Sequence, residues 1–262
     1  MSSRIKKFER RITRSKKKFE RRIARSKAKI KKLVYRVGIV SSSDIVLIDP
    51  KQKKRLYPCN LGILFCGGFL RRFYPKIVAQ IELLFDGFFY NIVDLGHHGF
   101  SKKMLTKGIK KENFKWKKED LSTELQLHPT NKFYQVLIDK RTENHLDMIM
   151  ALTNLPIYSS SDNTIMFLYG EANLDHSCCV VSSLILKEQF YKRRRNRKLY
   201  EQRIEKEAIH EIGHLILGPE HCHNELCVMN FCQNIENIDK KYLGLCYECT
   251  EKLEKLKYAY NI

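Results

Sequence analysis

The sequence has no long hydrophobic run, since no stretch of its 262 residues approaches the roughly 18 consecutive apolar residues of a membrane-spanning helix. Its N-terminus is charged throughout and lacks the apolar segment of a secretory signal. We therefore expect an intracellular, cytoplasmic protein in a reducing compartment. Clustered cysteines in such a protein are more often metal ligands than disulfides.

Acidic residues are scarce, because 29 Asp and Glu stand against 49 Lys and Arg for a formal net charge of +20. Two segments carry this excess: residues 4–32 hold 16 Lys and Arg against two Glu, a net of +14, and residues 192–198 add +6. The rest of the chain is close to neutral. Its 43% apolar composition is sufficient for a full core, in one large domain or two small ones.

The basic segment 1–33 has the pattern of an amphipathic arm. An 11-residue unit occurs twice, as KFERRITRSKK at 7–17 and KFERRIARSKA at 18–28, and its apolar residues fall on one stripe of a helix. Such an arm can bind an anionic partner, either nucleic acid or a membrane surface. The alternatives are a solvated helix, a disordered tail or a mitochondrial transit peptide. The run 192–198 has similar alternatives: contact with acidic substrates or nucleic acid, or a solvated helix face.

The pattern of apolar runs in residues 34–262 predicts one domain of alternating strands and helices. Lys102–Lys118 is polar and is predicted to be a surface insertion. The predicted strands are Val34–Val40, Ile45–Ile48, Asn91–Leu95, Tyr134–Ile138, Ile165–Tyr169 and Cys179–Leu186. The predicted helices are Pro75–Phe89, Asn144–Thr153 and Leu199–Leu217, with a charged helix at the end of Tyr242–Tyr258. This alternation is typical of mixed α/β and α+β domains.

The most informative residues are His210, Glu211 and His214. The two histidines are four residues apart, so on a helix they project from one face and can bind one zinc ion. Gly218 can end that helix and reverse the chain, which would bring His221 back as a third ligand. Three protein ligands leave a fourth position for water, as in catalytic zinc sites. The alternative is a helix with two ordinary buried histidines.

Glu211 stands beside the first histidine and can reach a water on the metal. Zinc lowers the pKa of a bound water to about 7, which makes hydroxide available at neutral pH. Glu211 would accept the proton of this zinc-bound water and pass it to the leaving amine. The sequence therefore predicts a metal-dependent hydrolase with Glu211 as its catalytic residue.

Four cysteines predict a second zinc site. They form two close pairs, Cys222 with Cys227 and Cys246 with Cys249. Two such pairs joined by a loop suit a closed, tetrahedral and therefore structural site. Cys232 lies in the same loop and is a competing ligand, and four buried free thiols are the alternative. Two zinc ions per chain are expected.

The segment His210–Cys249 resembles the archaemetzincins, metzincin-clan zinc peptidases of family M54. Their motif is HExxHxxGxxHCx4CxM followed by CxxC, and a weaker resemblance extends upstream to about residue 130. It implies that His210, His214 and His221 bind the catalytic zinc, and that Glu211 is the general base and acid. It also implies that Met229 forms an apolar floor beneath the metal and that the four cysteines bind a structural zinc.

One departure from the motif affects the third ligand. Gly218 follows His214 by four residues instead of the family's three, so His221 comes one residue late. One extra helical residue rotates the exit by about 100°. A π-bulge or a tighter last turn can absorb it; otherwise His223 or Glu220 can take the third place.

We therefore predict a zinc metallopeptidase with an α+β, metzincin-like fold: a twisted mixed sheet, an active-site helix and a C-terminal cysteine–zinc loop, preceded by a basic N-terminal helix. Ile165–Tyr169 is the expected edge strand that holds an extended substrate. The resemblance implies peptide or small-protein substrates, with an aminopeptidase preference as one option. The alternative function is an inactive, zinc-stabilised binding module that uses its basic segments for nucleic acid or anionic membrane.

Overall fold

The computed structural model describes residues 57–100, 127–161 and 167–262, which belong to one compact unit, Lys54–Ile262. The predicted arm 1–33, the strands Val34–Val40 and Ile45–Ile48, and the insertion Lys102–Lys118 lie outside these residues, so these elements stay predictions. Within the described ranges, no helix is long and apolar enough to cross a membrane.

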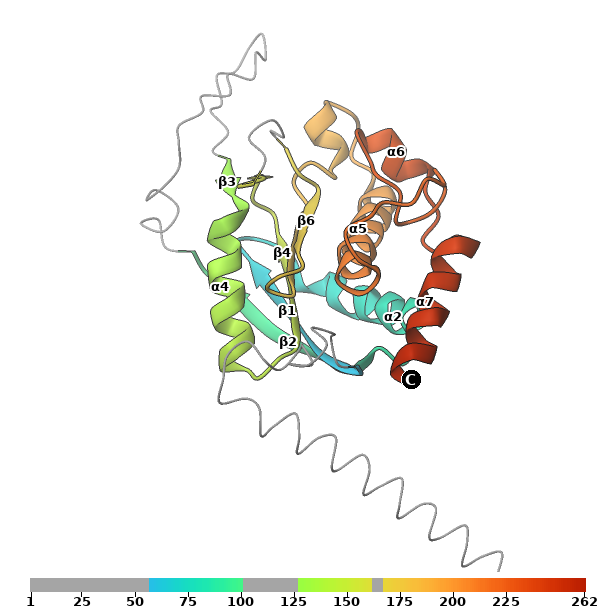
Figure 1. Cartoon of the computed structure of the whole chain (residues 1–262). Helices are drawn as coiled ribbons and strands as arrows, with labels where there is room; N and C mark the ends of the chain where they lie inside the picture. Colours follow the sequence, from blue (N-terminus) through green and yellow to red (C-terminus); the bar gives the residue numbers. More distant parts are fainter. Residues whose placement is uncertain (1–56, 101–126, 162–166) are drawn as a thin grey trace, which may run out of the picture. The chain divides into compact units, whose positions relative to one another are not determined.

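A five-stranded mixed sheet forms the centre of the unit, in the order β2-β1-β4-β7-β6 (Figure 1). Its strands are β1 (Cys59–Cys66), β2 (Phe89–His98), β4 (Met148–Thr153), β6 (Gly170–Asn173) and β7 (Cys178–Ser182). The first four in that order are parallel, whereas β6 runs antiparallel to β7 at the edge. Two short segments, β3 (His128–Pro129) and β5 (Ile157–Tyr158), pair separately. The expected mixed sheet is confirmed.

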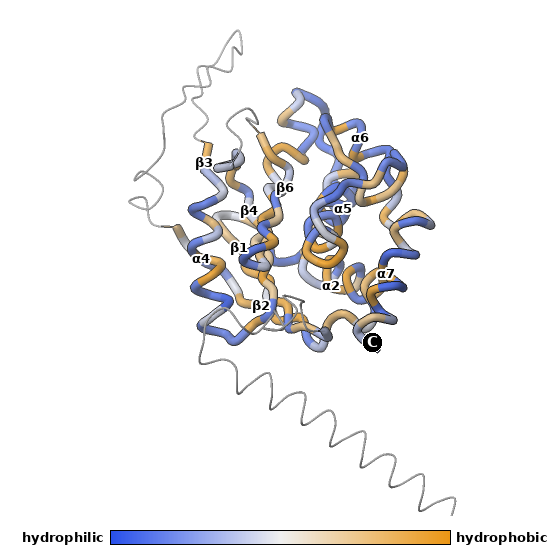
Figure 2. The backbone as a smooth tube through the Cα atoms, viewed as in Figure 1, coloured by the Kyte–Doolittle hydropathy of each residue, from blue (hydrophilic) through white to orange (hydrophobic). Residues whose placement is uncertain are grey.

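Helices cover both faces of this sheet (Figure 1). One face packs against α4 (Thr130–Glu143), whose Phe133 and Leu137 join a core with Ile149 and Val180. The other face packs against α5 (Arg197–Leu217), which also contacts α2 (Tyr74–Leu84). Because both faces are covered, β4 and β7 are buried along their whole length. Figure 2 shows apolar positions along the strands and also on helices α4 and α5.

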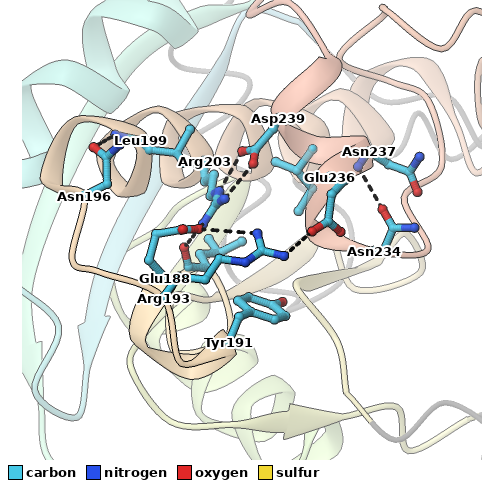
Figure 3. Close-up of polar contacts among 12 residues, drawn as sticks. Glu188, Tyr191, Arg193, Asn196, Leu199, Arg203, Asn234, Glu236, Asn237 and Asp239 are labelled. Carbon is cyan, nitrogen blue, oxygen red and sulfur yellow. Dashed lines mark hydrogen bonds and ion pairs between the residues drawn. The ribbon is translucent and has the colours of Figure 1, made fainter.

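An ion-pair network holds α5 in place (Figure 3). Arg203 is fully buried, and its guanidinium lies 2.6 Å from Glu188 and 2.6 Å from Asp239. Glu188 begins the 3₁₀ helix η2 (Glu188–Tyr191), and Asp239 belongs to α6 (Ile235–Lys240). The network therefore joins α5 to the segments that precede and follow it.

The last helix, α7 (Tyr247–Tyr260), is the charged C-terminal helix that the sequence predicted.

Several predicted elements agree with the structure. The long helix at Leu199–Leu217 is α5, and the strand at Asn91–Leu95 lies within β2. The strand predicted at Cys179–Leu186 is β7 only as far as Ser182, after which the chain bends and turns. The helix predicted at Pro75–Phe89 is α2, which ends at Leu84, while Phe89 already begins β2.

Three predicted elements are wrong. Tyr134–Ile138 is part of helix α4, because a short run rich in apolar residues fits either a helix or a strand. Asn144–Thr153 contains strand β4, which is buried on both faces and therefore lacks the alternation of an ordinary strand. The edge strand expected at Ile165–Tyr169 is β6, which begins only at Gly170; of the described residues before it, Leu168 forms an isolated bridge with Ile157.

Candidate metal centre

Three histidines meet at the C-terminal end of α5. His210 and His214 lie one turn apart on the helix, with their Nε2 atoms 3.1 Å from each other. The ring centre of His221 lies 5.3 Å from that of His210 and 4.7 Å from that of His214. One ring nitrogen of each residue lies within 4.8 Å of the other two. The structure thus brings the three predicted ligands together around one point.

Backbone carbonyls orient the two helical histidines. The Nδ1 atom of His210 lies 2.8 Å from the Val228 carbonyl, and the Nδ1 atom of His214 lies 2.9 Å from the Gly218 carbonyl. An Nδ1–H that donates to a carbonyl leaves the lone pair on Nε2, the atom that faces the shared point. Burial also lowers the pKa of both rings and, with His214 and Lys241, lowers that of His221 to about 4. The neutral form required of a metal ligand is therefore favoured.

The extra residue before Gly218 is absorbed outside the helix. Helix α5 stays a regular α-helix to Leu217, with neither a π-bulge nor a tighter last turn. The Gly218 N–H then donates to the His214 carbonyl at 3.1 Å, and the chain turns at Gly218 with φ 104°. The following loop brings His221 to the other two rings. His223 and Glu220 are exposed and lie outside the histidine group.

Glu211 is a buried carboxylate with a free oxygen. Burial, reinforced by the nearby carboxylates of Glu207 and Glu171, raises the pKa of Glu211 well above its usual value. Its Oε2 atom has no hydrogen-bond partner among the described residues. Gly170, the first residue of β6, lies against the carboxylate so closely that a β-carbon there would overlap it. Strand β6 thus sets the position of the Glu211 side chain.

A cleft of about 760 Å³ opens in front of these residues. Residues of strand β6, the three histidines and Glu211 all line this cleft. Aromatic side chains supply much of the remaining lining, namely Phe167, Tyr169, Phe190, Tyr191 and Phe231. Within the described sheet, β6 is the edge strand, so its outer side is available to a further strand. The cleft is thus suited to an extended chain with apolar side chains.

Sequence reasoning missed several residues in this cleft and next to it. Glu171 accepts a hydrogen bond from the Tyr134 hydroxyl at 2.6 Å, and the Lys241 ammonium donates to the Val228 carbonyl at 3.1 Å. Glu207 lies one turn before Glu211 on α5, so helical spacing could have identified it. Tyr134 and Lys241 come from distant segments and carry no motif.

The four predicted cysteines form a second cluster. Their sulfur atoms all lie within 4.8 Å of one another, and the Cys222 and Cys246 sulfurs are 3.5 Å apart. Backbone N–H groups point at this cluster: that of Cys246 donates to the Cys227 sulfur at 3.3 Å, and that of Asn224 donates to the Cys222 sulfur at 3.4 Å. Cys232 lies outside the cluster and instead lines the cleft.

The sequence of this chain is similar to those of known peptidases. Residues 105–255 match the model of Peptidase family M54. The archaemetzincin of Methanocaldococcus jannaschii is 37% identical over 123 residues, which cover 47% of this chain and 66% of the relative. The archaemetzincin of Saccharolobus solfataricus is 45% identical over 71 residues, which cover 27% of this chain and 38% of the relative. The sequence match thus spans less than two thirds of the length of each of these relatives.

Solved structures share the fold. The crystal structure of archaemetzincin from Methanopyrus kandleri aligns with a TM-score of 0.57 at 20% identity, covering 76% of this chain and 95% of that one. The archaemetzincin of Archaeoglobus fulgidus aligns with a TM-score of 0.53 at 23% identity, covering 74% of this chain and 99% of that one.

Proposed function

The chain belongs to peptidase family M54, whose model matches more than half of its residues, and we propose that it is a zinc metallopeptidase that hydrolyses peptide bonds. One observation carries this proposal: the buried carboxylate of Glu211 presents a free oxygen to the cleft in which three histidines meet. In hydrolytic zinc sites, neutral imidazoles bind the metal and a carboxylate beside them acts on the metal-bound water.

The residues present suit a zinc ion. His210, His214 and His221 offer three ring nitrogens around one point, and two of the rings are oriented through Nδ1 by backbone carbonyls. When bound there, zinc would supply Lewis-acid chemistry: it polarises the scissile carbonyl and makes water acidic. Met229 contacts the helix between the first two ligands and provides the apolar floor.

Glu211 is the general base and acid of the proposed reaction. Its carboxylate takes a proton from the attacking water and delivers it to the nitrogen of the leaving amine. The substrate binds as an extended peptide beside edge strand β6, whose unpaired N–H and C=O groups give main-chain hydrogen bonds. Peptides or small proteins are the proposed substrates, with cleavage near a free N-terminus as one option.

The cysteine cluster is the proposed site of a second, structural zinc. Cys222, Cys227, Cys246 and Cys249 provide four sulfurs and leave no position for water. Because Cys222 directly follows His221, this site would fix the loop that carries the third histidine. We therefore propose two zinc ions per chain, one catalytic and one structural.

Replacing Glu211→Gln tests the proposed reaction. The amide cannot accept the proton, so peptide hydrolysis should fall by about 10²–10⁴-fold, while both metals stay bound. Glu220→Gln is the matched control, because Glu220 is exposed and lies outside the histidine group. Assays with free and blocked N-termini distinguish aminopeptidase from endopeptidase activity. Hydrolysis by Glu211→Gln at the parent rate would contradict the mechanism and favour the binding-module alternative.

The basic arm suggests a separate partner. Its net charge of +14 over residues 4–32 favours binding to nucleic acid or an anionic membrane surface. Deleting residues 1–33 should abolish salt-sensitive binding to these polyanions and leave peptide hydrolysis intact. Equal binding after the deletion would exclude this role.

A further inference from the structure

A second cavity lies at the opposite end of α5 from the histidines. It occupies about 290 Å³ where strands β1, β4 and β7 end and α5 begins. These three strands are parallel neighbours, so their carboxyl ends share one edge of the sheet. Ligands of parallel α/β sheets commonly bind at that edge. His210 comes thirteen positions after Arg197 on this helix, a distance of about 20 Å along the axis.

The charges around this cavity are all of one sign. Arg72, Lys187, Arg195 and Arg197 line it, and no carboxylate does so among the described residues. Arg197 forms an ion pair with Glu201 at 2.8 Å. The other three cations have no ion pair within the part of the chain that the structure describes. Their charge is therefore available to an anion.

Lys187 is the most informative of these cations. It is half-buried, and burial lowers the pKa of its ammonium group without a carboxylate to oppose the effect. Its neighbour is the ring of Tyr200, whose centre lies 5.8 Å from the ammonium nitrogen. A partly desolvated cation without a carboxylate is costly, and a bound anion would offset that cost.

A buried hydroxyl faces the same cavity. Ser183 follows β7 and is fully buried, and it lines the cavity together with Tyr200. Burial raises the pKa of Tyr200, whereas a side-chain hydrogen bond with Ser183 and the charge of Arg72 lower it. Buried hydroxyl groups are usually hydrogen-bonded. The hydrogen bond between Ser183 and Tyr200 uses only one of their two O–H groups, and an oxygen atom of a bound anion would accept the other.

The start of α5 adds backbone donors. Asn196 accepts the Leu199 N–H at 3.1 Å (Figure 3), while the first N–H groups of the helix have no intrahelical acceptor. The partial positive charge of a long helix is concentrated at this end.

We propose that this cavity binds a phosphorylated small molecule through its phosphate group. Arginine forks, an ammonium group, a hydroxyl and helix N–H groups are together the donors that phosphate oxygens accept. The volume is at the lower limit of the roughly 300–1,000 Å³ of small-molecule sites, which leaves space beyond one phosphate. The fully buried Ser183 favours a small ligand that enters the cavity over a polymer that stays on the surface.

Calorimetric titration of the full-length protein with inorganic phosphate and with pyrophosphate, at constant ionic strength, tests this site. Lys187→Met and Arg195→Gln should each weaken binding by about tenfold or more, because each removes a charged donor. Arg194→Gln is the matched control: it removes the same charge from the adjacent residue, which does not line the cavity. This control should stay within about twofold of the parent, as expected for a surface charge.

Three results would overturn the proposal. One is the absence of saturable heat with either anion at millimolar concentration. Another is equal weakening by Arg194→Gln and Arg195→Gln, which would indicate diffuse surface attraction. Capture of zinc by pyrophosphate would give the same heat in all variants and would likewise count against the site. If Lys187→Met does not fold by circular dichroism, the two exposed arginine variants decide the outcome.

Discussion

Met229 packs against Gly213 so closely that a β-carbon on Gly213 would overlap the methionine sulfur. Gly213 lies on α5 between His210 and His214, and Met229 is buried. The residue before it, Val228, offers its carbonyl to the Nδ1 atom of His210. Val228 and Met229 are consecutive residues of the loop. Val228 therefore orients the His210 ring, and Met229 packs against the helix between His210 and His214.

Gly213→Ala should destabilise the protein, although alanine is the better helix former. Alanine gains about 1 kcal/mol of helix propensity, whereas overpacking a buried site costs about 1–3 kcal/mol. We expect a lower temperature of thermal unfolding, measured by differential scanning calorimetry. Gly244→Ala is the control, because a β-carbon there has no heavy atom within 4 Å.

The double variant Gly213→Ala/Met229→Ala tests the contact itself. Met229→Ala alone leaves a cavity, which the new methyl group at position 213 partly fills. The double variant should therefore be more stable than the sum of the two single effects predicts. Strict additivity would show that the two residues are not coupled.

Gly170→Ala should impair catalysis more than folding. The added methyl group must displace the Glu211 carboxylate, and a misplacement of about 1 Å can cost about 10²-fold in rate. We expect kcat to fall while the zinc content stays at the parent value. Gly99→Ala is the matched control, since its β-carbon would have no neighbour within 4 Å. Equal kcat values for these two variants would refute the role of β6 in positioning Glu211.

Sequence patterns predicted the fold where periodicity was strong. Helix α5 was predicted to within two residues at its start and at its end, because a helix of this length repeats its pattern several times. Strand β1 was not predicted, and strand β4 was predicted as a helix. Both are buried on their two faces, so their apolar runs carry no alternation that marks a strand.

The candidate site was predictable where its residues are close in sequence. His210, His214 and His221 lie within one helix and the loop after it, so spacing alone suggested a shared metal. Gly170 and Lys241 reach the site only through the sheet and the C-terminal loop. Only the tertiary structure indicates their positions.

Arg203→Met should strongly destabilise the protein. The change leaves Glu188 and Asp239 without their buried partner, and breaking a buried ion pair costs about 3–5 kcal/mol. Arg193→Gln removes an exposed pair with Glu236 and should cost less than about 1 kcal/mol. Urea unfolding measures both free energies. Similar values for the two variants would argue against Arg203 as the anchor of α5.

Cys227→Ser should remove one zinc ion per chain and lower the unfolding temperature. Serine is a poor replacement for a thiolate ligand, and a structural zinc contributes directly to folding. Cys232→Ser, in the same loop but outside the cluster, should keep both metals. Elemental analysis of the purified variants gives the metal count. Loss of zinc from Cys232→Ser would show that the ligand set is wrong.

Anomalous diffraction at the zinc absorption edge decides whether the chain holds a two-zinc peptidase centre. We predict two peaks per chain, one among the nitrogens of His210, His214 and His221 and one among the four cysteine sulfurs. A single peak at the cysteines, with none at the histidines, would contradict the account and identify a zinc-stabilised module without a catalytic metal.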